Sequence, residues 1–381
     1  MVARTERGPV ADWMRTVDPW LLGCFGGLMA IGVVMALAAS PAVAERIGLD
    51  PFHFVNRQTL LMIPSAAMLA ATSFLSPRYA RRAALLLYVA AFGLIIATLL
   101  FGAEVKGSRR WIVGLQPSEF IKPAFVILAA WAFTEAGRIG TPRGVARALS
   151  LLILPVTIVP LILQPDFGQT ILIATVWAAL FFMAGLHWFW VIGLGGAGAF
   201  GLGLAYRFSG HVHDRIQHFL NPDSAAGGVS DTFQVDTALQ SLLSGGWYGR
   251  GPGEGLYKRI LPDAHTDMVF AVIGEEFGLI ACFGLITFFG VIVMRGLWLS
   301  SRNQDSFSRF AAAGLTIMFG VQSWINMAVN LRAIPAKGMT LPFISYGGSS
   351  LLALGLGMGF LVALTRKNLN ITSRSHLPGA A

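Results

Sequence analysis

Residues 261–270, with the sequence LPDAHTDMVF, mark the point at which a polar segment gives way to an apolar one. The segment before Asp267 is polar and rich in glycine, and the residues after it, MVFAVIG, begin a long apolar run. Such a run is typical of a membrane-spanning helix, so Asp267 should lie where the hydrocarbon begins. An ionisable group at that depth is costly, which indicates a functional site. The simpler alternative is that Asp267 caps the helix.

The composition indicates an integral membrane protein. Of 381 residues, 55% are hydrophobic and 12% are charged, whereas about 25% of the residues of a soluble domain are charged. Apolar runs long enough to cross about 30 Å of hydrocarbon as helices recur along the chain. We predict an all-α integral membrane protein with ten transmembrane helices, at residues 20–39, 59–75, 83–101, 117–135, 148–163, 169–186, 188–206, 267–293, 310–330 and 346–365. Residues 20–365 would form one domain, with tails at 1–19 and 366–381.

The distribution of basic residues predicts the orientation of these helices. With both termini on the cytoplasmic side, the inner segments carry about twice as many Lys and Arg residues as the short outer loops, as the positive-inside rule requires. This N-in, C-in topology makes both tails cytoplasmic and places the large loop 207–266 outside, between the seventh and eighth helices. A loop of this length is expected to carry structure. Within it, the apolar residues of 231–243 recur at helical spacing, which predicts a helix there.

Basic residues on the outer side run against this orientation bias. The ones of interest lie in two loops and are Lys106, Arg109, Arg110 and Lys337. They indicate an anionic ligand, or else their side chains reach lipid headgroups at the ends of helices. The glycine-rich segment 247–255 of the large loop adds Arg250, and its backbone amides could also approach an anion.

Charged residues within the apolar helices are expected to face the interior of the bundle, because a lone charge in lipid is expensive. Glu119 and Lys122 are three residues apart on one helix, so they can form an ion pair. An alternative is that this pair only fixes helix packing. Glu275 and Glu276 lie about two turns into their helix and should also point inward. Asp166, in a very short outer turn, is most simply a turn or cap residue.

Several motifs lie between residues 106 and 350 of the chain. They are KGSRRW at 106–111, QPSE at 116–119, the segment 261–267, the pair Glu275-Glu276, KGMTLP at 337–342 and SYGGSS at 345–350. Together they closely resemble the SEDS family of shape, elongation, division and sporulation proteins. The likeness spans the third to the tenth predicted helix and is strongest to the division branch, with the elongation branch as the alternative. Asp263 and Met268 depart from the family pattern, in which Glu and Phe are commoner at these positions.

The resemblance implies a peptidoglycan glycosyltransferase of the bacterial inner membrane, with its active site facing the periplasm at the division septum. Such an enzyme would polymerise lipid II by inverting transfer, with undecaprenyl diphosphate as the leaving group. The implied partners are lipid II, membrane lipid, a class B penicillin-binding protein and proteins of the division machinery, with no nucleic acid. No metal site and no certain cofactor are expected, although Mg²⁺ or Mn²⁺ could assist in binding the diphosphate.

The resemblance also suggests which residues act. By motif match, the catalytic residues would be Asp267 and Glu119. The candidate substrate-binding residues are Lys106, Arg109, Arg110, Lys122, Arg250, His265, Lys337 and Ser345. Asp267 could act as a base on the attacking hydroxyl, and the cations could stabilise the charge that develops on the diphosphate.

Two other classes of function have to be weighed against an enzyme. A lipid II flippase would also use ten helices with inward-facing charges, but transport predicts charges in both leaflets and internal repeats, and the sequence has no such repeat. A scaffold that only anchors division partners would leave the intramembrane residues Glu119, Lys122 and Asp267 without a role.

Overall fold

The computed structural model describes residues 8–105, 108–137, 143–185, 188–208, 231–335 and 338–367, together with isolated positions between 208 and 231. Two of the candidate binding residues, Lys106 and Lys337, lie outside the described residues. The described chain is helical apart from a short antiparallel hairpin of β1 (Ala103–Val105) and β2 (Ser108–Trp111). The prediction of a helical membrane protein is therefore confirmed, and the hairpin is a feature that it did not include.

A helix occupies each of the ten predicted spans. These helices are α2 (Pro19–Arg46), α3 (His53–Ser73), α4 (Pro77–Phe101), α5 (Pro117–Ala136), α6 (Arg143–Leu163), α7 (Phe167–Met183), α8 (Trp188–Phe208), α11 (Val269–Ser301), α12 (Ser306–Asn330) and α13 (Gly348–Leu364). Among the described residues, α2, α4, α11 and α12 combine the length and the apolar composition of a membrane span. The predicted bounds of several helices are wrong by more than one turn; for example, α2 and α11 continue about two turns beyond residues 39 and 293, and α3 and α4 begin six residues before residues 59 and 83.

Aspartates begin several of these helices. The side chains of Asp18, Asp166 and Asp305 accept hydrogen bonds from backbone N–H groups at the first turns of α2, α7 and α12, respectively. Such N-caps satisfy donors that have no partner within the helix. Proline at the first position also favours the starts of α2, α4 and α5. The prediction that Asp166 caps a helix is thus confirmed.

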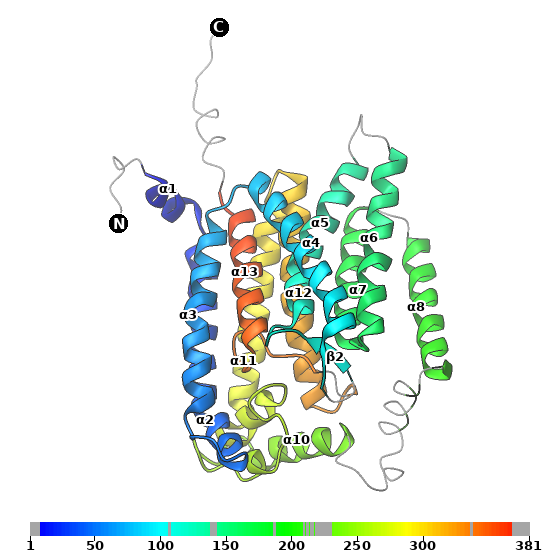
Figure 1. Ribbon diagram of the computed structural model, residues 1–381. Helices are drawn as coiled ribbons and strands as arrows, with labels where there is room; N and C mark the ends of the chain where they lie inside the picture. Colours follow the sequence, from blue (N-terminus) through cyan, green and yellow to red (C-terminus); the bar gives the residue numbers. More distant parts are fainter. Residues whose placement is uncertain are drawn as a thin grey trace.

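The two ends of the bundle differ. Helix α1 (Pro9–Thr16) and the C-terminal end of α13 lie at one end, at the top of Figure 1, and α10 (Asp231–Gly245) lies across the opposite end. The helix predicted within 231–243 is thereby confirmed as α10, which buries Val235, Ala238 and Leu242 and leaves Leu243 exposed. The hairpin and the start of α11 are at the same end as α10 (Figure 1).

The centre of the bundle is formed by α5, α12 and α13, in which most side chains are buried. Large apolar side chains on outer helices are exposed instead, for example Leu86 and Val89 of α4 and Leu60 of α3. An exposed apolar surface of this kind suits contact with lipid. The central helices are those that carry Glu119, Lys122 and the serines of the last motif, so these polar groups lie away from lipid.

Helix α11 is interrupted at Gly278, whose φ of 79° is outside the helical range. At the interruption the glycine-rich segment 246–251 supplies hydrogen bonds that the helix lacks. Leu279 donates its N–H to Gly246 O at 2.9 Å, and Arg250 donates its N–H to Glu275 O at 2.9 Å. A positive φ is readily adopted by glycine. The large loop is thus fastened to α11 about two turns beyond Asp267.

Candidate functional site

Asp267 is half-buried and lies in the turn that leads into α11. The N-cap position of this helix is Met268, which makes no side-chain capping bond. The Ala271 N–H at the helix start is donated instead to Asn330 Oδ1, at 3.1 Å, from α12. A capping group is therefore supplied from another helix, and this finding weakens the view that Asp267 serves only as a cap.

The segment after residue 337 runs directly beside the Asp267 carboxylate. A Cβ atom placed on Gly338 would lie 3.3 Å from Asp267 Oδ2, so this backbone passes close to the carboxylate. Close by, the Tyr346 N–H is donated to His265 O at 2.9 Å. Two motifs that are far apart in the sequence thus meet at Asp267.

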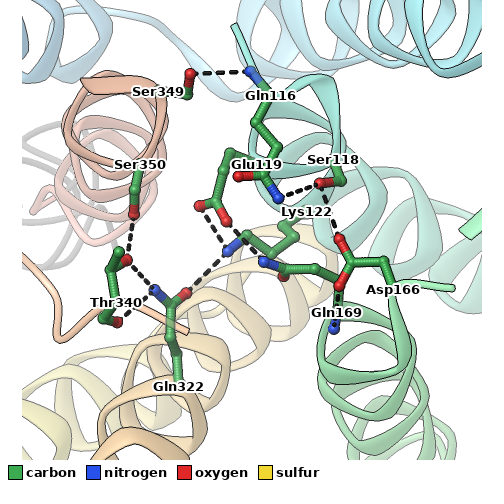
Figure 2. Close-up of polar contacts among 10 residues, drawn as sticks. All are labelled: Gln116, Ser118, Glu119, Lys122, Asp166, Gln169, Gln322, Thr340, Ser349 and Ser350. Carbon is green, nitrogen blue, oxygen red and sulfur yellow. Dashed lines mark hydrogen bonds and ion pairs between the residues drawn. The ribbon is translucent and has the colours of Figure 1, made fainter. Parts of the chain in front are cut away.

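Glu119 and Lys122 form the predicted inward-facing ion pair, which Figure 2 shows at the centre of a polar network. Lys122 Nζ lies 2.8 Å from Glu119 Oε2, and both side chains are buried. Gln169 of α7 donates Nε2–H to Glu119 Oε1 at 2.6 Å, and Lys122 donates to Gln322 Oε1 of α12 at 3.0 Å. Each carboxylate oxygen has a donor, so the cost of burying these charges is offset.

The network continues from α12 to the last motif (Figure 2). Gln322 donates Nε2–H to Thr340 O at 3.1 Å, and the hydroxyl oxygens of Thr340 and Ser350 are 2.6 Å apart. On the other side, Ser349 Oγ accepts the Gln116 N–H at 2.9 Å. The motif around Glu119 and the motif around residue 345 are therefore joined through α12 and α13.

The structure separates the neighbouring arginines of the hairpin. Arg109 is exposed, and its Nη2 lies 3.6 Å from Glu104 Oε2. Arg110 is half-buried and donates to two carbonyl oxygens of the turn between α6 and α7, Gln164 O at 3.3 Å and Pro165 O at 2.6 Å. Arg110 thus helps to hold this turn, whereas the charge of Arg109 faces outward.

Asp166, in the same turn, is buried next to Arg110. Burial raises the pKa of its carboxyl group, and the Arg110 guanidinium, whose Nη1 lies 3.9 Å from Asp166 Oδ1, opposes that shift. Asp166 Oδ2 also accepts the Ser118 hydroxyl at 3.4 Å (Figure 2). The turn is therefore fixed against the first turn of α5, where Glu119 lies.

His265 lies between two aromatic rings. Its ring centroid is 4.6 Å from that of Phe54 and 5.2 Å from that of Tyr346. Burial lowers the pKa of His265 to about 4, so its imidazole is neutral at neutral pH and offers no cationic charge to a diphosphate. Ser345 is buried, and its Oγ accepts the Leu341 N–H at 2.8 Å, which closes the turn of that loop.

Arg250 lies beside the interruption of α11, with its side-chain Nε–H donated to Ser244 O at 3.1 Å. Glu275 and Glu276, which are buried as predicted, hold the loop at this point. Glu275 accepts the N–H groups of residues 256–258 at 2.6 to 3.1 Å and the Ser241 hydroxyl at 3.0 Å. Glu276 forms an ion pair with Lys258. These carboxylates therefore have structural partners.

Several polar residues at the site were not among the sequence candidates: Gln169, Lys258, Gln322, Asn326 and Asn330. Spacing offers one signal for three of them, because Gln322, Asn326 and Asn330 recur every four residues in an apolar helix and so share one face. Within the part of the chain that the structure describes, no group of three or more His, Cys, Asp or Glu residues could hold a metal ion. A role for a divalent cation stays a prediction.

The family model for the cell cycle proteins FtsW, RodA and SpoVE matches residues 19–370. The chain belongs to this family. A relative from Caulobacter vibrioides, named "Probable peptidoglycan glycosyltransferase FtsW", is 46% identical over 370 residues, which cover 96% of this chain and 93% of the relative. The protein of the same name from Legionella pneumophila is 31% identical over 374 residues, which cover 95% and 94% of the two chains.

Two solved structures have the same fold as this family member. One, from work on the structural coordination of polymerization and crosslinking by a peptidoglycan synthase complex, has a TM-score of 0.76 at 26% identity and covers 92% of this chain and 97% of its own. The other is the Rod shape determining protein RodA of Thermus thermophilus, with a TM-score of 0.66 at 25% identity and coverage of 92% and 96%. The family resemblance predicted from the motifs is thus confirmed.

Proposed function

We propose that this chain is a peptidoglycan glycosyltransferase that polymerises lipid II into glycan strands during cell division. The observation that carries this proposal is the 46% identity, over 96% of the chain, to a relative named as such an enzyme. Further relatives with the same name match nearly the full length. The elongation branch remains the alternative within the family, because the RodA fold is shared.

The enzyme is a multi-pass protein of the bacterial inner membrane, and we assign it ten crossings with both termini in the cytoplasm. The helices that coincide with the ten predicted spans support this topology. So does the position of α10, which lies at the end of the bundle opposite to α1. Asp267 and the hairpin would then face the periplasm, at the division septum.

In the proposed reaction, a sugar hydroxyl attacks C1 of the sugar that carries the diphosphate. The new C–O bond forms as the bond from C1 to the diphosphate oxygen breaks, and the bonding pair leaves with undecaprenyl diphosphate. The hydroxyl proton passes to Asp267, which acts as the base. The half-buried position of Asp267 at the end of the bundle suits a group that must meet both solvent and a membrane-bound substrate.

Charge on the leaving diphosphate requires cations nearby. Arg109 is suited to this role because its side chain is exposed and its hairpin lies at the same end of the bundle as the start of α11. Lys106 and Lys337 are further candidates for binding the diphosphate. Lys122 is paired with Glu119 and Arg110 is engaged with a turn, so we assign them to shaping the site. Arg250, His265 and Ser345 would contribute to the wall of the site through the loops that they hold.

We further propose that the enzyme works with a class B penicillin-binding protein and with proteins of the division machinery. The similarity to a chain of a peptidoglycan synthase complex supports an assembly of this kind. The exposed apolar surfaces of the outer helices suit membrane lipid.

The deciding experiment incubates the purified protein with labelled lipid II, with and without a class B partner, and resolves the products on a gel. We expect glycan polymers with the wild-type protein. A protein that moves lipid II across a vesicle membrane without polymer in either condition would contradict the proposal and favour the flippase. A protein that does neither would favour the scaffold.

A further inference from the structure

Three amides form a row on α12. Gln322, Asn326 and Asn330 are spaced by four residues, so they lie on one face of the helix. All three are buried, with exposed fractions of 1%, 1% and 0%. We call these three residues the amide row. Buried amides in an apolar helix are costly unless their polar atoms are satisfied, so each should have a definite partner.

Asn326 connects the two loops that meet at the site. Its Nδ2 donates to Asp267 O at 2.8 Å and to Met339 O at 2.7 Å. Both acceptors are carbonyl oxygens, so the amide orientation is fixed, because a flipped amide would set its oxygen against two others. Asn326 Oδ1 is buried without a hydrogen-bond partner among the described residues. The donors of Asn326 are therefore the part of the side chain that the structure uses.

Asn330 binds the same carbonyl oxygen. Its Nδ2 donates to Asp267 O at 3.0 Å, and its Oδ1 accepts the Ala271 N–H at 3.1 Å. One backbone oxygen thus receives donors from two residues of the amide row. Since the carbonyl and the side chain of Asp267 share a Cα atom, fixing this oxygen restricts where the carboxylate can lie.

Gln322 extends the row to the second candidate carboxylate. Its Oε1 accepts Lys122 Nζ at 3.0 Å, and its Nε2 donates to Thr340 O at 3.1 Å. Thr340 follows Met339, the residue held by Asn326. A continuous set of hydrogen bonds therefore runs from Glu119 through Lys122 and the 339–340 backbone to the backbone of Asp267.

We propose that the amide row is a positioning device for the transfer reaction: it holds the Asp267 segment in register with the loop that follows residue 337 and with the Glu119–Lys122 pair. This inference rests on the proposed function. The reaction needs its base within hydrogen-bond reach of one hydroxyl, and a shift of about 1 Å can lower a rate by about 100-fold. The residues of the row do not touch the reacting atoms, so they act through Asp267.

The test replaces single amides by the isosteric acid. Asn326→Asp removes both donors, and Asn330→Asp removes the donors to Asp267 O but keeps an oxygen for the Ala271 N–H. The matched control is Ser323→Ala on the same helix, where a hydroxyl that is equally buried donates only to Phe319 O of its own helix, at 2.8 Å. The measurements are kcat and KM for lipid II, hydrogen exchange of the segments 261–268 and 338–345, and the thermal midpoint.

We expect each acid variant to lower kcat about 10-fold or more with KM changed less than about 3-fold, a loss that belongs to the chemical step. The two segments should exchange faster than in the control. The ratio of variant to wild-type kcat should rise as the pH falls from about 8 to about 6, because a protonated acid regains one donor. In the Asp267→Asn background the same changes should cause no further loss, since the row acts through Asp267.

Unchanged kcat and exchange in both acid variants, or a loss of the same size in the Asp267→Asn background, would overturn the positioning role. If Asn326→Asp does not accumulate in the membrane, the results for Asn330→Asp alone test the positioning role, because this variant retains the acceptor for the Ala271 N–H at the start of α11. A wild-type protein that makes no polymer would refute the proposed function alone, and hydrogen exchange of the two segments would still test the row.

Discussion

At the residue scale, a chemical role for the Asp267 side chain is compatible with the start of α11, because Asn330 supplies a capping group there. The Ala271 N–H is bound by Asn330, and the Asp267 backbone is held by Asn326 and Asn330. A change of the Asp267 side chain should therefore leave the start of α11 and the Asp267 backbone in place.

Asp267→Asn tests that role with a side chain of nearly the same size. Asn cannot accept the hydroxyl proton, so polymerisation should fall by about 100-fold or more. The yield in the membrane and the thermal midpoint should match those of the wild type, because Asn and Asp also rank together as helix caps. Polymerisation of labelled lipid II measures the effect, and a wild-type rate would transfer the role of base to another residue, with Glu119 the first to examine.

The two arginines of the hairpin should respond differently to replacement by Gln. Arg109 is exposed and pairs only loosely with Glu104, so Arg109→Gln should raise KM for lipid II several-fold and leave the thermal midpoint unchanged. Arg110→Gln removes donors from two turn carbonyls and should lower the thermal midpoint. If Arg109→Gln leaves KM unchanged while Lys337→Gln does too, the outer cations serve lipid headgroups instead.

How much of this site could be predicted differs from residue to residue. Asp267 and Glu119 could be found because a carboxylate within an apolar run is conspicuous, and the Lys122 pairing followed from helical spacing. Gln169 could not be found in this way, and the spacing of Asn326 indicates a shared helix face but not its partners, because the contacts of both residues join elements that are far apart in the sequence. Arg110 appeared equivalent to Arg109, and only the carbonyls of a distant turn distinguish them.

At the element scale, the joint between α11 and the large loop combines backbone hydrogen bonds with a buried ion pair. Lys258, in the short 3₁₀ turn Tyr257–Arg259, pairs with Glu276 and also donates to Ala38 O of α2 at 3.1 Å. Both charged side chains are buried. The sequence predicted that Glu276 faces inward. The interruption at Gly278 and its hydrogen bonds to the glycine-rich segment 246–251 were not predictable, because isolated glycines in apolar helices are common.

Removal of one charged partner of this pair should lower the thermal midpoint more than removal of both charges. Lys258→Met leaves Glu276 buried without its cation, which typically costs about 3–5 kcal/mol, so the thermal midpoint of the purified protein should fall clearly. The double variant Lys258→Met with Glu276→Gln removes the charge as well and should recover part of that loss. Thermal unfolding of the three proteins in detergent checks this, and equal midpoints for the single variant and the wild type would contradict it.

At the scale of the whole molecule, the arrangement of helices was largely predictable because apolar runs and loop charges are properties of the sequence alone. The helices coincide with the predicted spans, and the differences include their ends, the hairpin, the short helix α1 and the interruption of α11. The orientation in the membrane is a separate matter, since it concerns which end of the bundle faces the periplasm.

Cysteine labelling can test the orientation without reference to activity. Tyr248, in the large loop, and Gln304, between α11 and α12, are both exposed. In a variant without Cys24 and Cys282, Tyr248→Cys should react with a membrane-impermeant thiol reagent added to intact spheroplasts, and Gln304→Cys should react only after the cells are opened. The reverse pattern would contradict the N-in topology and a periplasmic active site together.

The ion pair on α5 also bears on how the protein is made. Its two charges, three residues apart, lie on the same helix, whereas Gln322, which binds Lys122, follows 200 residues later. When α5 leaves the ribosome, its Glu119 and Lys122 can already neutralise each other, so the helix need not enter the bilayer with an unpaired charge. The polar centre of the enzyme thus begins as a self-contained pair during synthesis, gains Gln169 with α7, and acquires Gln322 and the groups of the last motif only when the last two helices are inserted.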